Sequence, residues 1–142
     1  VCSSDLSDVL QTQSLWRFNE ESCAHDFYSS CTVLLNNLLV PSPLVPAISI
    51  DGKEVLTIEG FSKTDDYKDI RSGFERAGFH PCSRCAESKI LLAHTVIEEN
   101  PNPRKGSLKE VSASARCRCT SYTKYMEGII FAAQYRRRRF HA

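Results

Sequence analysis

The sequence predicts an α+β fold with N-terminal helices, a β-hairpin, a third helix and then a small antiparallel sheet. Three patterns support this class. An apolar stripe at three- and four-residue spacing indicates helix early in the chain, Asp51-Gly52 between apolar runs indicates a hairpin, and alternation after Leu108 indicates strands. With 142 residues, 42% of them hydrophobic, the chain is long enough to bury one core.

The N-terminal part of the chain is predicted to be helical. Residues 1–6 resemble the translation of a common sequencing adapter, so we expect a non-native leader there and exclude it from the fold. Residues 7–19 form one expected helix, with Ser7 at its N-cap, and residues 20–40 form a second. The apolar stripe of this second helix consists of Cys23, Phe27, Cys31, Leu34, Leu35 and Leu38. Three prolines in residues 41–46 must end it.

The middle of the chain predicts a hairpin followed by a helix. Residues 47–58 form the expected hairpin around a type I′ turn at Asp51-Gly52, with Ile48 and Ile50 on one face of its first strand. Residues 64–77 form the third helix, because Thr64 can cap its start and Gly78 can stop it.

The C-terminal part of the chain is predicted to be a small sheet. Residues 89–98 are interpreted as a buried strand with helix as the alternative, and residues 108–122 as an alternating strand. Residues 125–135 are interpreted as a strand, again with helix as the alternative. We expect a single domain over residues 7–135 and a basic tail over 136–142. Since no apolar run is long enough to cross a bilayer, no membrane span is expected. The absence of any Asn-X-Ser/Thr glycosylation acceptor favours an intracellular location.

Seven cysteines suggest a structural site. Four of them form two short pairs, Cys82-X2-Cys85 and Cys117-X-Cys119, which fit a zinc ion, disulfides or free structural thiols. We predict zinc bound by these four cysteines. Cys23 and Cys31 lie two turns apart on the predicted helix, too far for a disulfide within one straight helix. Either the helix breaks near residues 28–30 or both are buried free thiols, and we expect buried thiols.

Charge is divided unevenly along the chain. From Arg104 onward there are 10 basic and 2 acidic residues, against 8 basic and 15 acidic residues before it. Such a split predicts either an anionic partner for the basic part or two halves that face each other. Alternating arginines near aromatic side chains favour nucleic acid or an acidic protein surface as the partner. The predicted nucleic-acid-binding residues are Arg116, Arg118, Lys124, Tyr135, Arg136, Arg137, Arg138 and Arg139.

Residues 81–87, with the sequence Pro-Cys-Ser-Arg-Cys-Ala-Glu, resemble one half of the zinc site of nucleobase deaminases. The resemblance implies a metal-activated water and a catalytic glutamate, but the His-X-Glu that completes the site in that family is missing. We therefore predict a non-enzymatic nucleic-acid-binding or ribonucleoprotein-associated protein with a structural zinc site. The alternatives are a secreted, disulfide-stabilised interaction protein and a diverged zinc-dependent deaminase-like protein.

Overall fold

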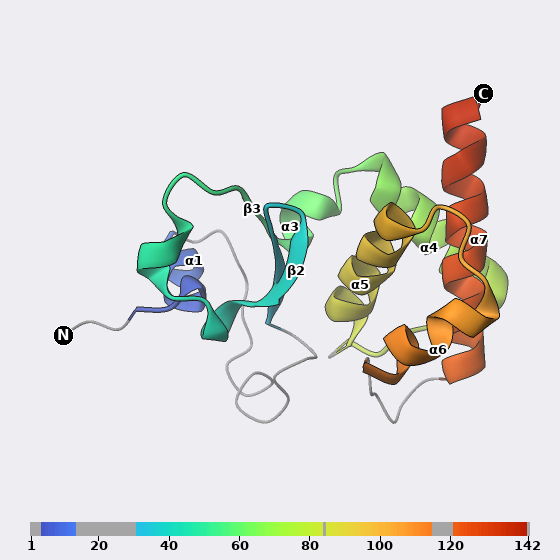
Figure 1. The fold of residues 1–142 in the computed structure, drawn as a ribbon, viewed down its shortest axis with the longest axis horizontal. Coiled ribbons are helices and arrows are strands. Elements are labelled where there is room, and N and C mark those ends of the chain that lie inside the picture. The colour runs from blue at the N-terminus through green and yellow to red at the C-terminus, as the bar shows by residue number, and fades with distance from the viewer. Residues whose placement is uncertain (1–3, 14–30, 84, 115–120, 142) are drawn as a thin grey trace.

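A computed structural model describes residues 4–13, 31–83, 85–114 and 121–141, without the side chains of 112–114. The fold combines helices with one small antiparallel sheet, which confirms the predicted α+β class. The order of the parts differs from the prediction, because the sheet precedes the main group of helices (Figure 1). Within the described ranges, no helix is both long and apolar enough to cross a membrane.

The sheet contains β1 (Thr32–Leu35), β2 (Leu38–Pro41) and β3 (Val55–Leu56), in the order β2-β1-β3. Two asparagines, Asn36 and Asn37, form the loop between β1 and β2, with φ angles of 47° and 66°. Asparagine tolerates this left-handed region, and a two-residue loop of this kind suits a hairpin. The helix predicted over residues 20–40 is therefore wrong for its described part, 31–40.

The first helix, α1 (Leu6–Thr12), begins with a capping box. The Asp5 carboxylate accepts from the Asp8 backbone N–H, and the Asp8 side chain accepts from the Asp5 N–H in return. Leu6 is fully buried against a small core that includes Val33 and Cys31. Asp5 and Leu6, the last two residues of the expected leader, form the start of this helix. Its N-cap is therefore Asp5 and not the predicted Ser7. Cys31 is disulfide-bonded, so the expectation of a free thiol is wrong for this residue.

The region between β2 and β3 contains two short 3-10 helices. It contains η1 (Ser42–Leu44) and η2 (Ala47–Ile50), and the turn at Asp51-Gly52 follows, with Gly52 at a φ of 71°. The strand beyond this turn, β3, pairs with β1 and not with the residues just before the turn. The hairpin predicted over 47–58 is therefore wrong. The residues before the turn form η2 instead, and the segment just ahead of them pairs with the start of the chain: the Val45 carbonyl accepts from the Leu6 N–H, and the Ala47 N–H donates to the Ser4 carbonyl.

A short helix, α3 (Ile58–Phe61), leads into α4 (Asp65–Ala77). The Thr64 hydroxyl accepts from the Tyr67 backbone N–H at 3.2 Å, and Gly78 ends α4 with a φ of 66°. Both ends of this helix confirm the prediction, because the cap and the stop are local signals.

Helices occupy the places where strands were predicted. The structure has α5 (Ala86–Glu99), α6 (Lys105–Ser114) and α7 (Tyr122–His141). The strand predictions for 89–98, 125–135 and the described part of 108–122 are therefore wrong, while the helix alternatives for 89–98 and 125–135 are confirmed. Buried residues surround most of α5, which removes the one-sided apolar stripe that would have indicated a helix. The predicted basic tail continues α7 as helix through His141.

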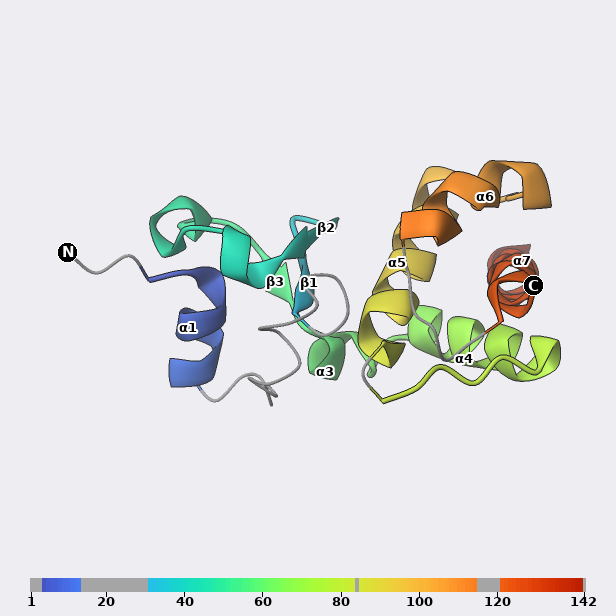
Figure 2. The same ribbon diagram turned by 90° about the horizontal axis from the view of Figure 1, so that it is seen from below.

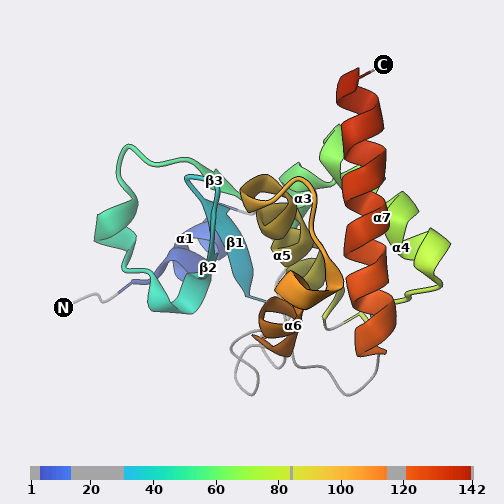
Figure 3. The same ribbon diagram turned by 45° about the vertical axis from the view of Figure 1, so that its right-hand side comes forward.

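Two glycines bring α4 and α7 into backbone contact. A Cβ built on Gly73 would lie 2.4 Å from the Ala132 nitrogen, and one on Gly128 would lie 2.7 Å from a ring carbon of Phe74. Figure 3 shows α7 as the long helix with α4 against it. Figure 2 shows the sheet as a layer between α1 and α5. Leu34 faces the large helical core, and Val33 faces the small core beneath α1.

Candidate metal centre

The Cys82–Cys85 pair lies in the connection between α4 and α5. Gly78 turns the chain out of α4, and the Cys82 carbonyl accepts from the backbone N–H groups of Cys85 and Ala86 at 3.1 and 2.9 Å. This tight turn directs both thiols to one side at the beginning of α5. Their Sγ atoms are 3.2 Å apart.

Cys82 and Cys85 form no disulfide with each other. Their Sγ separation of 3.2 Å is far longer than the S–S bond of about 2.04 Å in a disulfide. Burial, together with the hydrogen bond to Cys82, raises the pKa of the Cys85 thiol above its ordinary value, and the Lys89 ammonium opposes the shift. Metal ions bind the thiolate form of cysteine, so metal binding releases the thiol protons. The positive charge of the metal would then balance the negative charge of two buried thiolates.

An aromatic cluster covers this pair from the α7 side. The ring centroids of Phe79 and Tyr125 are 5.1 Å apart, and Phe74 meets Phe79 edge-on at 4.9 Å. The Tyr125 hydroxyl donates to the Lys89 carbonyl at 2.9 Å, so the first turn of α7 is fixed beside the first turns of α5. Burial raises the pKa of Tyr125, which keeps this hydroxyl a donor.

The second cysteine pair, Cys117 and Cys119, lies outside the described residues. The structure resumes at Ser121, two residues after Cys119 in the sequence, and the Ser121 carbonyl accepts from the Tyr125 backbone N–H at 3.1 Å. The chain therefore re-enters the fold next to the residues that surround Cys82 and Cys85. Four-cysteine binding stays a prediction, since only two of the four ligands are described.

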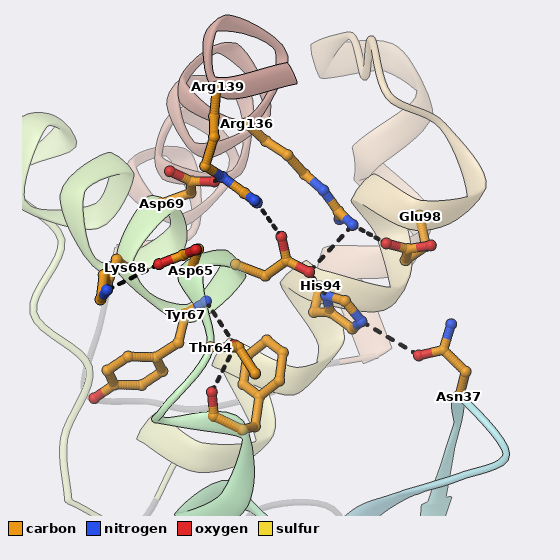
Figure 4. A network of polar contacts seen from close by, with 12 residues as sticks. Asn37, Thr64, Asp65, Tyr67, Lys68, Asp69, His94, Glu98, Arg136 and Arg139 are labelled. Atoms are coloured by element: carbon orange, nitrogen blue, oxygen red, sulfur yellow. Dashed lines mark hydrogen bonds and ion pairs between the residues drawn. The ribbon is translucent and has the colours of Figure 1, made fainter. Parts of the chain in front are cut away.

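Most of the predicted nucleic-acid-binding residues lie on α7, and Arg116 and Arg118 lie outside the described residues. Arg136 forms ion pairs with Asp66 of α4 and Glu98 of α5 (Figure 4). Arg139 contacts Asp66 and donates to Asp69 at 2.9 Å. The arginines at the end of α7 thus face carboxylates at the start of α4, an arrangement that also suits both helix dipoles. The basic C-terminal part of the chain thus faces acidic residues of the preceding part, which is one of the two arrangements that the uneven charge predicts.

The same network holds a buried histidine. His94 is 5% exposed, its Nε2 lies 3.3 Å from the Asn37 Oδ1, and its Nδ1 lies 3.8 Å from an Asp66 oxygen. Burial and the nearby Arg136 lower the pKa of His94. Although Asp66, His94 and Glu98 converge as metal ligands could, the Arg136 guanidinium contacts both carboxylates and already supplies the positive charge. We therefore interpret this group as an ion-pair network.

Comparison with known proteins identifies the chemistry of the cysteine region. The profile of the [2Fe-2S] binding domain matches residues 57–130, which is half of the chain and includes both cysteine pairs. The nicotine 6-hydroxylase small subunit of Paenarthrobacter nicotinovorans is 29% identical over 127 residues, covering 89% of this chain and 76% of that protein. The xanthine dehydrogenase iron-sulfur-binding subunit of Escherichia coli O157:H7 is 26% identical over 133 residues, covering 92% of this chain and 82% of that protein.

The fold is also known from experiment. Quinoline 2-oxidoreductase from Pseudomonas putida 86 contains a chain that superposes with a TM-score of 0.75 at 26% sequence identity. The superposition covers 94% of this chain and 84% of that one. The similarity therefore spans the sheet and α1 as well as the matched helical region.

These findings correct the predicted function, cofactor and partner. The matched domain binds a [2Fe-2S] cluster, so the prediction of zinc is wrong. The relatives carry the names of dehydrogenase and hydroxylase subunits, so nucleic-acid binding and a nucleic-acid partner are wrong as well. The same match corrects the two alternative functions, an interaction protein and a deaminase-like protein. Cysteine thiolates bind both zinc and iron–sulfur clusters, so the ligand type alone could not separate these cofactors.

Proposed function

The chain belongs to the [2Fe-2S] binding domain family, and we propose that it is an electron-transfer component of a dehydrogenase. In this proposal Cys82, Cys85, Cys117 and Cys119 bind one cluster. The observation that carries it is the placement of the Cys82 and Cys85 sulfurs, which lie 3.2 Å apart at one turn before α5. Four cysteine thiolates are the usual ligand set of such clusters.

The residues around the pair suit a carrier of electrons. When bound, a [2Fe-2S] cluster accepts and releases single electrons. Phe79 and Tyr125 exclude water from the protein side of the Cys82–Cys85 pair, since they are 2% and 1% exposed. Cys82 stays partly exposed, which leaves one side of the pair near the surface. A cluster bound here would be shielded from water on its protein side. Its exposed side would remain close enough to the surface to exchange electrons with a partner.

The packing of the helices supports ligands from two distant segments. The first cysteine pair precedes α5 and the second precedes α7, while α7 is held against α4 at Gly73 and Gly128. Metal binding at such a divided site stabilises the fold, because a preformed set of ligands does not exist in the unfolded chain. We therefore expect loss of the cluster to loosen the contact between the starts of α5 and α7.

We further propose that the partner is a larger subunit of the same enzyme. This is supported by relatives whose names describe small or iron–sulfur subunits and whose length is mostly covered by this chain. The partner would carry the substrate site, and this chain would carry electrons away from it or toward it.

Anaerobic reconstitution with iron and sulfide tests the proposal. Reduction with dithionite should produce an electron paramagnetic resonance signal that disappears on reoxidation. The Cys85→Ser variant should lose most of its bound iron. The matched control Cys2→Ser, which changes a cysteine outside residues 57–130, should retain it. A full iron content in Cys85→Ser, or the absence of a reversible signal in the wild type, would refute the proposed function.

A further inference from the structure

A buried lysine lies beside the Cys82–Cys85 pair. Lys89 is 4% exposed, although lysine is rarely this buried unless a specific interaction holds it. Its backbone N–H donates to the Cys85 carbonyl at 3.1 Å, so Lys89 lies one helical turn after Cys85. Residues four apart share one face of a helix, and Lys89 therefore lies on the face of α5 that begins with Cys85.

Two aromatic rings hold the Lys89 ammonium in place. Its Nζ lies 5.2 Å from the ring centroid of Phe79 and 5.2 Å from that of Tyr125. Both rings are almost fully buried, so these cation–π contacts are made where water screens the charge little. The hydrogen bond from the Tyr125 hydroxyl to the Lys89 carbonyl fixes the same turn of α5. These contacts place the Lys89 Nζ at the protein side of the cysteine pair.

We propose that Lys89 raises the reduction potential of the cluster bound by Cys82 and Cys85, an inference that rests on the proposed function. Reduction adds one negative charge to the site, so a fixed positive charge nearby stabilises the reduced form more than the oxidised form. Lys89 forms and breaks no bond in this change. In a titration the electron comes from dithionite.

Among the lysines and arginines of the described helices, Lys89 is the one that is fully buried. Lys68 on α4, for example, has a 71% exposed side chain paired with Asp65, and water and salt screen such a charge. Lys68 lies near the start of α4, ten residues before Gly78, so the helix separates it from the cysteine turn by about 15 Å. Lys68→Met therefore removes the same charge at an exposed, distant position.

The test is a redox titration of the reconstituted full-length chain, followed by electron paramagnetic resonance. Lys89→Met keeps an unbranched side chain of similar length without the charge. We expect it to lower the ratio of reduced to oxidised cluster at least tenfold at a given potential, a shift of about 59 mV for one electron. Lys89→Arg and the control Lys68→Met should titrate close to the wild type. An unchanged midpoint in Lys89→Met, or an equal shift in Lys68→Met, would overturn the proposal.

Iron and sulfide analysis of each variant separates the two levels of the inference. A wild type without a cluster refutes the proposed function, whereas a loaded Lys89→Met with an unchanged potential refutes only the role of Lys89. If Lys89→Met does not load, Lys89→Gln replaces it in the titration. If both neutral variants lose the cluster while Lys89→Arg still binds it, the proposed effect on the reduction potential is overturned. Lys89 would then be needed for assembly of the cluster.

Discussion

Replacing Gly73 by alanine should separate α4 from α7. An added Cβ would lie 2.4 Å from the Ala132 nitrogen and 2.6 Å from the Gly128 oxygen, and both of these atoms belong to the backbone. Non-bonded heavy atoms prefer about 3.5 Å, so the helices would have to move apart by about 1 Å. Overpacking in a core costs typically 1–3 kcal/mol, and backbone atoms cannot move aside as a side chain can. We therefore expect Gly73→Ala to lose about 3 kcal/mol of unfolding free energy.

Urea unfolding followed by circular dichroism measures this loss. Gly106→Ala is the matched control, because no heavy atom lies within 4 Å of the Cβ it would add on α6. Alanine is the better helix former, so this control should be as stable as the wild type or more stable by up to about 1 kcal/mol. Equal midpoints for Gly73→Ala and the wild type would show that the two helices do not cross at this glycine.

Two further predictions concern the ion-pair network. Arg136→Met should lower the unfolding free energy by about 2 kcal/mol, because Asp66 and Glu98 lose a partner whose side chain is 15% exposed. The exposed Arg138→Met should change it little in the same urea titration, and equal losses in both variants would contradict the network. Burial lowers the pKa of His94, so the unfolded chain binds a proton that the folded chain does not, and stability should fall as the pH drops below about 6.5. His94→Gln should remove this part of the slope between about pH 7.5 and about pH 5.5, whereas an unchanged slope would mean that His94 does not titrate as described.

Local signals in the sequence predicted their elements well. Thr64 and Gly78 fix the two ends of α4 through a side-chain cap and a left-handed stop, and neither signal depends on the rest of the fold. The loop at Asn36 and Asn37 gives no such local signal, because two asparagines inside an apolar run are also compatible with a helix. A two-residue loop between Leu35 and Leu38 also places leucines at helical spacing, so two short strands produced the periodicity of a helix.

Signals that depend on tertiary contacts could not be predicted in the same way. Helix α5 is buried on most of its surface, and a run of apolar residues with a β-branched end then has no distinctive period. For the site, the cysteine pairs were recognised but the cofactor was not, because thiolates serve several metals. Lys89 was missed because it was assigned to a strand. Counting four residues from Cys85 along a helix would have placed it beside the pair.

Native mass spectrometry of the anaerobically reconstituted chain tests the central claim most directly. We expect an added mass equal to two irons and two sulfides, present in the wild type and absent when Cys82 and Cys85 are both replaced by serine. An unloaded wild type, a single zinc ion in place of the cluster, or full loading of the double variant would contradict it.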